Sequence, residues 1–254
     1  MPSSASPSGP ADSGRGAVSA RAPEVIWLRP ERAGRGPRPA HSRAAIAAAA
    51  IEIADAGGLD AVSMRRVAAA LGAGTMSLYN YVPKKEHLFD LMLDAVVGEF
   101  VLPDEPGGDP RADLTLLGHQ MRAAMRRHHW VSGLLVSRPS LGPNALRCME
   151  YFLGAMEPTG LDGPAMMEAF TLLNGFVSQF AEWEHATARA GGGEGASGAQ
   201  WHTEVAAYLQ GVALSGRYPR LTRALAGSGP PPDADTVFER SLGRLLTVLT
   251  QPPA

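Results

Sequence analysis

Apolar residues recur along this 254-residue chain at the three- and four-residue spacings of one helix face. In residues 42–57 the stripe is Ile46, Ala50 and Ile53, and a broader apolar face fills residues 84–96. Alanine and leucine dominate, whereas runs of β-branched residues are scarce. We therefore expect an all-α protein.

Residues 63–82, SMRRVAAALGAGTMSLYNYV, have the pattern of two short helices joined by a tight turn. Ser63 and Thr75 are placed to cap the two helices, and Gly72 can adopt the left-handed conformation that ends the first. Each helix has one inward apolar pair: Val67 with Leu71, and Leu78 with Val82. This arrangement predicts a helix-turn-helix.

The outward face of the second helix is suited to entering a DNA major groove, which is about 12 Å wide. Ser77 and Asn80 can hydrogen-bond base edges, while tyrosine hydroxyls and flanking basic side chains can bond phosphates. The DNA-contact residues that we expect are Arg65, Thr75, Met76, Ser77, Tyr79, Asn80, Tyr81 and Lys85. Helix pairs with a glycine turn also occur in proteins that have no DNA partner, so the pattern alone leaves both interpretations open.

Residues 42–96 resemble the N-terminal domain of the tetracycline-repressor (TetR) family of regulators. The run LGAGTMSLYNYVPKKEHL, residues 71–88, carries the most specific likeness. More weakly, RPSLGPNALR, residues 138–147, and the helix after it look like the ligand-binding half of the tetracycline-repressor subgroup. The resemblance implies a homodimeric repressor that binds double-stranded operator DNA and is released by a small-molecule effector.

Charge is divided unevenly along the chain. Residues 29–85 carry nine Lys or Arg and four Asp or Glu, a net +5, whereas the remainder carries fourteen against twenty-one, a net −7. A basic N-terminal third on an acidic body is typical of a DNA-binding head on a body that does not bind DNA. The alternative is positive charge that is merely scattered.

We divide the chain into a disordered basic arm at residues 1–40, a helix-turn-helix DNA-binding domain at 41–100, and a helical ligand-binding and dimerisation bundle at 110–250. A Pro- and Gly-rich segment at 102–110 separates the two folded domains. In the arm, VIWL at 25–28 is an apolar island able to dock on the folded part. Four arginines then recur every third residue, a spacing that suits either an extended strand along DNA or a solvated tail: Arg29, Arg32, Arg35 and Arg38.

The body is expected to form helices joined by glycine- and proline-rich segments. The expected helices are 111–129, 130–137, 142–156, 162–188, 201–214, 218–226 and 234–250, with a mobile loop at 190–199 and a linker at 229–233. The last helix carries a stripe too apolar to face solvent: Phe238, Leu242, Leu245, Leu246 and Leu249. We expect this stripe and helix 162–188 to form a four-helix interface between two copies of the chain.

Asn174 lies on an otherwise apolar stripe of the body, and buried amides need partners. A small molecule can supply them in a cavity lined by Met121, Met125, Leu134, Phe152, Phe170, Asn174 and Phe176. The residue pattern by itself favours an ordinary core, with Asn174 bonded to backbone or to a partner chain, whereas the family resemblance favours a pocket. Leu134 stands where the tetracycline-type motif has a histidine, which argues against magnesium-tetracycline as the ligand.

No catalytic or metal-binding constellation stands out, so we expect neither an enzyme nor a cofactor. His128 and His129 are adjacent and point to different faces of a helix, unlike a zinc pair. The single Cys148 and the lack of a signal peptide or membrane span predict a cytoplasmic protein. Two rival hypotheses remain: a carrier or enzyme whose helix-turn-helix is only structural, and a DNA-binding regulator without a ligand.

Overall fold

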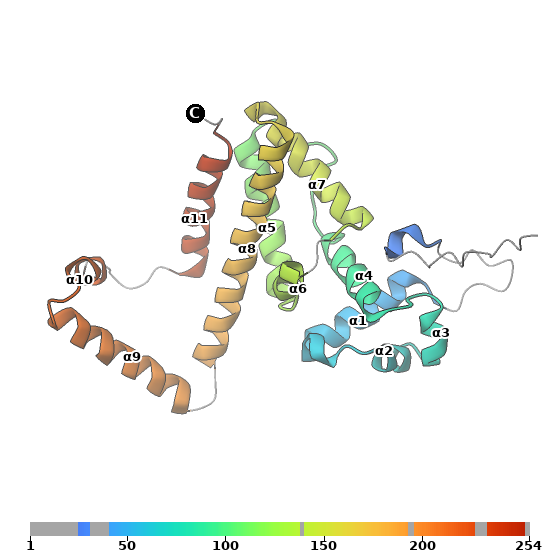
Figure 1. Ribbon diagram of the computed structural model, residues 1–254, viewed down its shortest axis with the longest axis horizontal. Coiled ribbons are helices and arrows are strands. Elements are labelled where there is room, and N and C mark those ends of the chain that lie inside the picture. Colours follow the sequence, from blue (N-terminus) through green and yellow to red (C-terminus); the bar gives the residue numbers. More distant parts are fainter. Residues whose placement is uncertain (1–24, 31–40, 138–139, 193–195, 227–232, 252–254) are drawn as a thin grey trace, which may run out of the picture.

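The computed structural model describes residues 25–30, 41–137, 140–192, 196–226 and 233–251, and within these ranges the chain forms helices and no strand (Figure 1). The all-α class predicted from the periodicity is thereby confirmed. A small N-terminal head lies beside a larger helical body (Figure 1). The head consists of η1 (Ile26–Leu28), α1 (Arg43–Gly57), η2 (Leu59–Ala61), α2 (Met64–Ala70), α3 (Thr75–Tyr79) and α4 (Lys85–Val97).

Serine side chains begin two helices of the head. The hydroxyl oxygens of Ser42 and Ser63 accept hydrogen bonds from the backbone N–H groups of Ala45 and Arg66, at 3.1 and 3.2 Å. Gly72, at φ +64°, allows the chain to turn between α2 and α3. The predicted cap at Thr75 is wrong, because Gly74 occupies the N-cap position and Thr75 is the first residue of α3.

The body begins after the segment that follows α4. Its elements are α5 (Pro110–Arg127), α6 (Val131–Ser137), α7 (Pro143–Met156), η3 (Glu157–Thr159), α8 (Gly163–Gly192), α9 (Ala196–Leu214), α10 (Pro219–Ala226) and α11 (Ala234–Leu249). The glycine-rich segment predicted to be a mobile loop at 190–199 is largely helical, because α8 continues to Gly192 and α9 begins at Ala196. Residues 193–195 and most of the predicted linker at 229–233 lie outside the described residues.

A buried arginine joins three helices of the body. Arg122, on α5, is only 4% exposed. Its guanidinium donates to Glu184 on α8 at 2.6 and 3.0 Å and to Asp235 on α11 at 2.8 Å, and it lies 4.1 Å from the centroid of the Phe238 ring. Burial raises the pKa of Glu184, but hydrogen bonds from Arg122 and Arg126 outweigh it and hold that pKa below its usual value.

The apolar stripe of α11 faces the interior of its own chain. Four of its residues are at most 6% exposed: Phe238, Leu242, Leu246 and Leu249. They pack against α5 and α8. The expectation that this stripe is free to bind a second copy is therefore wrong, and a charge at Leu246 would unfold the body rather than separate two subunits.

Helix α4 joins the head to the body, since it packs against α1 on one side and against α7 and α5 on the other. Its Asp94 is 5% exposed and accepts hydrogen bonds from the backbone N–H groups of Asn144 and Ala145 at 2.9 and 3.0 Å, and from Asn144 Nδ2 at 3.1 Å. The N-cap residue of α7 is Gly142, which has no side chain to accept these bonds. Asp94 thus caps α7 from a different helix, and burial raises its pKa although the same hydrogen bonds lower it.

The apolar island before α1 docks on the head. Ile26 is fully buried, and Arg43 Nη1 donates to the carbonyl oxygens of Ile26 and Arg29 at 3.4 and 2.9 Å. Residues 1–24 and 31–40 of the expected arm lie outside the described residues, and so do the other three arginines of the repeat, Arg32, Arg35 and Arg38.

Candidate DNA-binding surface and apolar cavity

Helix α3 presents one face to the head and the other to solvent. Leu78 and Val82 are fully buried, together with Val67 of α2. On the opposite face Met76 is 78% exposed, and Ser77 and Asn80 are also exposed. The exposed face therefore offers hydroxyl and amide groups, which can donate to and accept from base edges.

The other expected DNA contacts surround this face to different degrees. Tyr79, Arg65 of α2 and Lys85 at the start of α4 are exposed. Thr75 and Tyr81 are partly buried, so less of each side chain reaches the surface. Tyr81 packs against the core of the head, and its carbonyl oxygen accepts from Arg43 Nε at 3.4 Å.

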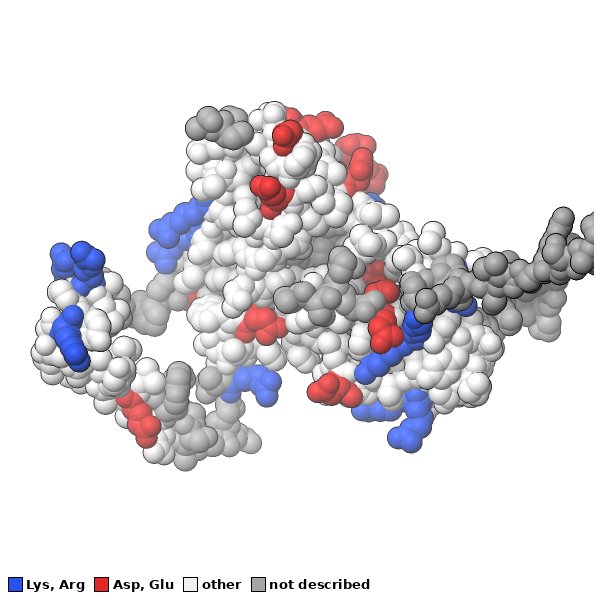
Figure 2. Space-filling view, in the orientation of Figure 1, with Lys and Arg blue, Asp and Glu red and all other residues white. Residues whose placement is uncertain are grey.

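Arg43 was not among the expected site residues, yet it holds two segments of the head together. The same guanidinium that binds the η1 segment also binds the turn after α3. The sequence showed that Arg43 directly follows Ser42, which caps α1, but it gave no sign of these two contacts. In Figure 2, Lys and Arg side chains lie along the lower rim of the head with some Asp and Glu side chains beside them, and other Asp and Glu side chains lie at the top of the body.

An apolar cavity of about 430 Å³ lies between α4, α5, α6, α7 and α8. Of the residues expected to line a ligand pocket, Met121, Met125, Phe170 and Asn174 are in its wall. Asn174 Nδ2 donates to the Phe170 carbonyl oxygen of its own helix at 3.0 Å. The amide donor is thus bonded to backbone, as the ordinary-core interpretation required, although the side chain also borders a cavity.

Three expected lining residues lie elsewhere. Leu134 and Phe152 are packed in the core, and Phe152 contacts the Phe170 ring edge-on at a centroid distance of 5.1 Å. Phe176 points to the opposite side of α8, where its ring stacks on Phe238. Helix periodicity places a residue on an apolar face but does not tell whether a neighbour or an empty space lies opposite.

Most of the cavity wall was not anticipated from the sequence, including every lining residue of α4, α6 and α7. The missed residues are Leu93, Val96, Val97, Phe100, Ala124, Val131, Leu135, Ser140, Leu141, Ala145, Cys148, Met149, Met167 and Thr171. The unusually broad apolar face of α4 was the available signal, because a helix buried on two sides needs apolar residues on both. Burial raises the pKa of the Cys148 thiol to about 11, so this thiol stays protonated at neutral pH.

A hydroxyl group in the cavity wall lacks a hydrogen bond. Ser140 Oγ is buried and makes no hydrogen bond to any residue that the structure describes. Buried hydroxyls are normally satisfied, so this group is suited to bonding a polar atom of a bound molecule.

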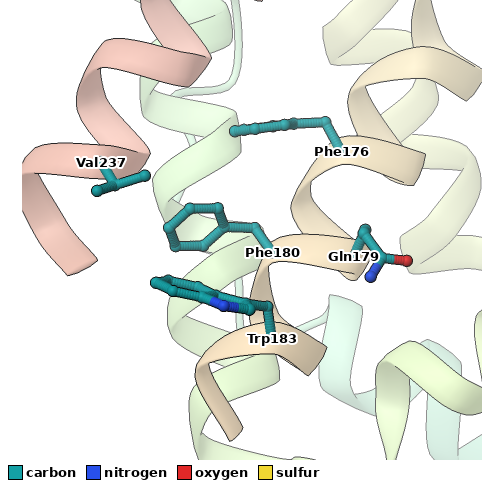
Figure 3. Close-up of a pocket in the computed structure, with 5 residues that line it drawn as sticks. All are labelled: Phe176, Gln179, Phe180, Trp183 and Val237. Carbon is teal, nitrogen blue, oxygen red and sulfur yellow. The ribbon is translucent and has the colours of Figure 1, made fainter. Parts of the chain in front are cut away.

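A second depression, of about 380 Å³, lies between α8 and α11 on the outside of the body (Figure 3). Figure 3 shows Phe180 and Trp183 of α8 directed toward α11, which carries Val237. Trp183 is 45% exposed, and the same side of the two helices also exposes Leu172 and Val248. This α8–α11 face is therefore apolar and open to solvent.

The part of the chain that the structure describes was searched for a metal site and for a membrane-spanning helix. No group of three His, Cys, Asp or Glu side chains there is arranged to hold a metal ion. Nor does any helix of the described residues combine the length and the apolar character needed to cross a membrane.

Comparisons with known proteins match both halves of the chain. Residues 46–92 match the family model described as bacterial regulatory proteins, tetR family, and residues 102–251 match the tetracyclin repressor-like C-terminal domain. The chain is 41% identical over 235 residues to the HTH-type transcriptional repressor DrrR1 of Streptomyces coeruleorubidus, which covers 92% of this chain and 86% of that protein.

Solved structures agree with this assignment. Apo ActR from Streptomyces coelicolor has a TM-score of 0.70 at 29% identity, covering 85% of this chain and 97% of ActR. ActR in complex with actinorhodin has a TM-score of 0.67 at 29% identity, covering 82% and 96%. The resemblance seen in the sequence is confirmed, and the chain belongs to the TetR family of helix-turn-helix transcriptional regulators.

Proposed function

We propose that this protein is a homodimeric repressor that binds operator DNA through α3 and is released when a small molecule occupies the α4–α8 cavity. The observation that carries the proposal is that one helix, α4, is both part of the head and part of the cavity wall. It packs against α1 of the head, while its Leu93, Val96 and Val97 form part of the cavity wall. A ligand that favours the non-binding state by a few kcal/mol is enough to release the DNA.

The DNA contacts are assigned by position on the outward face. Ser77 and Asn80 read base edges in the major groove, while Tyr79, Lys85 and Arg65 bind phosphates. Met76 adds apolar contact, and the partly buried Thr75 and Tyr81 support the helix at its two ends. In the dimer, the two α3 helices lie about 34 Å apart, one turn of DNA, and enter adjacent major grooves.

Asn80→Ala tests this assignment. We expect it to cost about 1–3 kcal/mol on the preferred operator and to relax preference at one base pair. Lys85→Ala should weaken binding to all sequences alike and lower the salt slope by about 1. Fluorescence anisotropy with an operator selected from a random duplex pool, and with a scrambled duplex, measures both effects. If Asn80→Ala binds the selected operator as tightly as the wild type does, a different face of the head reads DNA.

The effector that fits the cavity is a largely apolar compound with a few polar groups. The volume lies within the range of about 300–1,000 Å³ that is usual for ligand sites. Four methionines in its wall give an adaptable apolar surface: Met121, Met125, Met149 and Met167. Ser140, Thr171 and Asn174 supply the polar groups. The similar protein ActR has been solved with actinorhodin bound, which supports a ligand site in this fold.

Cys148→Trp should fill much of this cavity, because Cys148 lies in its wall. We expect the variant to lose most of the fluorescence gain that anilinonaphthalene sulfonate shows with the wild-type protein. Cys148→Ser, which keeps the side-chain size, should retain it. Dye bound at the exposed α8–α11 face is common to all three proteins and cancels in the comparison. Equal dye binding by Cys148→Trp and Cys148→Ser would rule out this cavity as the ligand site.

The α8–α11 face is the surface through which we propose that two copies associate. The sequence analysis expected the apolar stripe of α11 to form this interface, but that stripe is buried within its own chain. The proposed interface still uses α8 and α11, through their exposed sides. Two such helices from each chain can pack as a four-helix interface.

Trp183→Asp combined with Val248→Asp should therefore produce monomers, because both side chains are exposed on this face and a buried unpaired charge opposes association. Leu146→Asp on α7, where the leucine is 52% exposed outside this face, is the matched control and should stay dimeric. Sedimentation velocity separates the two states. A doubly substituted protein that sediments as the wild-type dimer places the interface elsewhere.

We further propose that the protein is not an enzyme and that it works in the cytoplasm without a cofactor. The relatives that match it are transcriptional regulators. The protonated Cys148 thiol is a poor nucleophile, and the cavity wall otherwise offers only hydroxyl and amide groups.

A further inference from the structure

A buried histidine lies where α1 of the head meets the end of α5. The His128 side chain is 6% exposed. Its Nδ1 lies 2.9 and 3.0 Å from the two carboxylate oxygens of Asp55 on α1, and its Nε2 lies 3.2 and 3.3 Å from those of Glu99, which follows α4. Trp130 Nε1 donates to Asp55 at 2.7 Å, and Arg127 Nη1 lies 2.9 Å from Glu99.

The hydrogen-bond geometry around His128 favours an imidazole ring that donates from both nitrogens. A neutral ring has one donor nitrogen and one acceptor nitrogen, whereas an ionised carboxylate only accepts. An acceptor nitrogen facing a carboxylate oxygen at about 3 Å would bring two lone pairs together. The Asp55 and Glu99 side chains are each about a third exposed, so both carboxylates also meet solvent. Both ring nitrogens of His128 therefore donate, and the ring is an imidazolium between two carboxylates.

This cluster adjoins the cavity on two sides. Phe100 directly follows Glu99, and Met125 and Val131 lie three residues before and after His128. All three line the cavity. A molecule that fills the cavity contacts Phe100, Met125 and Val131. A displacement of Phe100 is passed along the chain to Glu99, and a displacement of Met125 or Val131 is passed to His128.

We propose that His128 is the positioning residue that couples the state of the cavity to the placement of the DNA-binding head. This proposal rests on the proposed effector response. With the cavity empty, the imidazolium holds Asp55 of α1 to Glu99 at the end of α4 through charge-assisted hydrogen bonds. When the cavity is filled, Glu99 and His128 shift relative to α1 and the head is released from its DNA-binding position. Loss of the cation leaves two carboxylates facing each other, which favours the released arrangement.

Nitrogen NMR of the ring tests the charge state directly. In the protein free of DNA and ligand, at neutral pH, we expect both ring nitrogens of His128 to carry protons, and His128→Gln assigns the signals. We also expect the Trp130 indole N–H signal to move in His128→Gln, because its acceptor Asp55 loses its partner. A neutral His128 ring with one unprotonated nitrogen would overturn the proposal.

A double-mutant cycle tests the coupling, with Cys148→Trp as a built-in occupant of the cavity. Operator affinity is measured for the wild type, Cys148→Trp, His128→Gln and the double variant. We expect Cys148→Trp to weaken binding about tenfold in the wild-type background, a usual size for allosteric coupling, and by about twofold or less beside His128→Gln. Arg127→Gln is the control, because it removes the more exposed ion pair to Glu99 without touching Asp55, and the tenfold effect should persist in it.

The possible results distinguish a failure of the coupling role of His128 from a failure of the proposed effector response. An equal loss of affinity in the wild-type and His128→Gln backgrounds overturns the coupling role of His128, whatever its effect on melting temperature. If Cys148→Trp has no effect in the wild-type background, the effector response itself fails, and with it the role assigned to His128 in transmitting it.

Discussion

Gly142→Ala is expected to lower the midpoint of thermal unfolding by about 5–10 °C, corresponding to about 2–4 kcal/mol for a chain of this size. A Cβ at this position would lie 2.2 Å from Asp94 Oδ1 and 2.6 Å from Trp27 Cζ2. The backbone at Gly142, with φ −77° and ψ 170°, is accessible to alanine, so the cost comes from these contacts alone. Asp94 must move, and the open N–H groups of α7 then lose their acceptor.

The same substitution should also weaken operator binding, because the Asp94 bonds hold α4 to the body. Gly211→Ala, in α9, is the control, since an added Cβ meets nothing within 4 Å there. Alanine at a helical glycine with free space should be neutral or stabilise by about 0.5–1 kcal/mol. Differential scanning calorimetry compares the three proteins. If Gly142→Ala and Gly211→Ala unfold at the same temperature, the close approach of Asp94 to position 142 does not contribute to stability.

Leu78→Asn is expected to abolish DNA binding by unfolding the head. Leu78 is fully buried between α3 and the rest of the head. Removing its side chain from a packed core costs about 2–5 kcal/mol, and an amide buried without partners adds about 1–3 kcal/mol. We expect affinity for selected and scrambled DNA to fall together, in contrast to the sequence-dependent loss from Asn80→Ala.

Met76→Asn provides the matched control for this prediction. It makes a similar apolar-to-amide change on the same helix, but Met76 is 78% exposed. The melting temperature should stay near that of the wild type, and binding to scrambled DNA should persist. If Leu78→Asn retains the wild-type circular dichroism and melting temperature, Leu78 does not fix the orientation of α3.

Local signals in the sequence were sufficient for the head. The serine caps, the glycine turn and the two apolar pairs act between residues close in sequence, so they could be read without knowing the fold. The orientation of α3 follows from Leu78 and Val82 alone. The sequence indicated that the apolar island at 25–28 could dock on the folded part, and Ile26 is indeed buried. It did not indicate that Arg43 holds this segment, because the contact joins residues 17 positions apart.

The body shows why periodicity does not identify a neighbour. The stripe of α11 was correctly recognised as buried, but it packs on α5 and α8 of its own chain rather than on a second copy. Phe176 and Phe170 lie on the same long helix, yet only Phe170 borders the cavity. Two further contacts join residues that lie 29 to 73 positions apart: the capping of α7 by Asp94, and the bridge from Asp55 through His128 to Glu99. No local sequence motif indicates contacts over such separations.

The central claim, that the exposed face of α3 binds a specific operator, is tested most directly by a salt series of DNA affinity. An operator is selected from a random duplex pool, and dissociation constants for it and for a scrambled duplex are measured from low to high salt. We expect the selected duplex to bind at least about 10³-fold more tightly, with affinity for both falling steeply as salt rises. A carrier or enzyme with a merely structural helix-turn-helix would show no enriched sequence and no salt dependence, and that result would contradict the account.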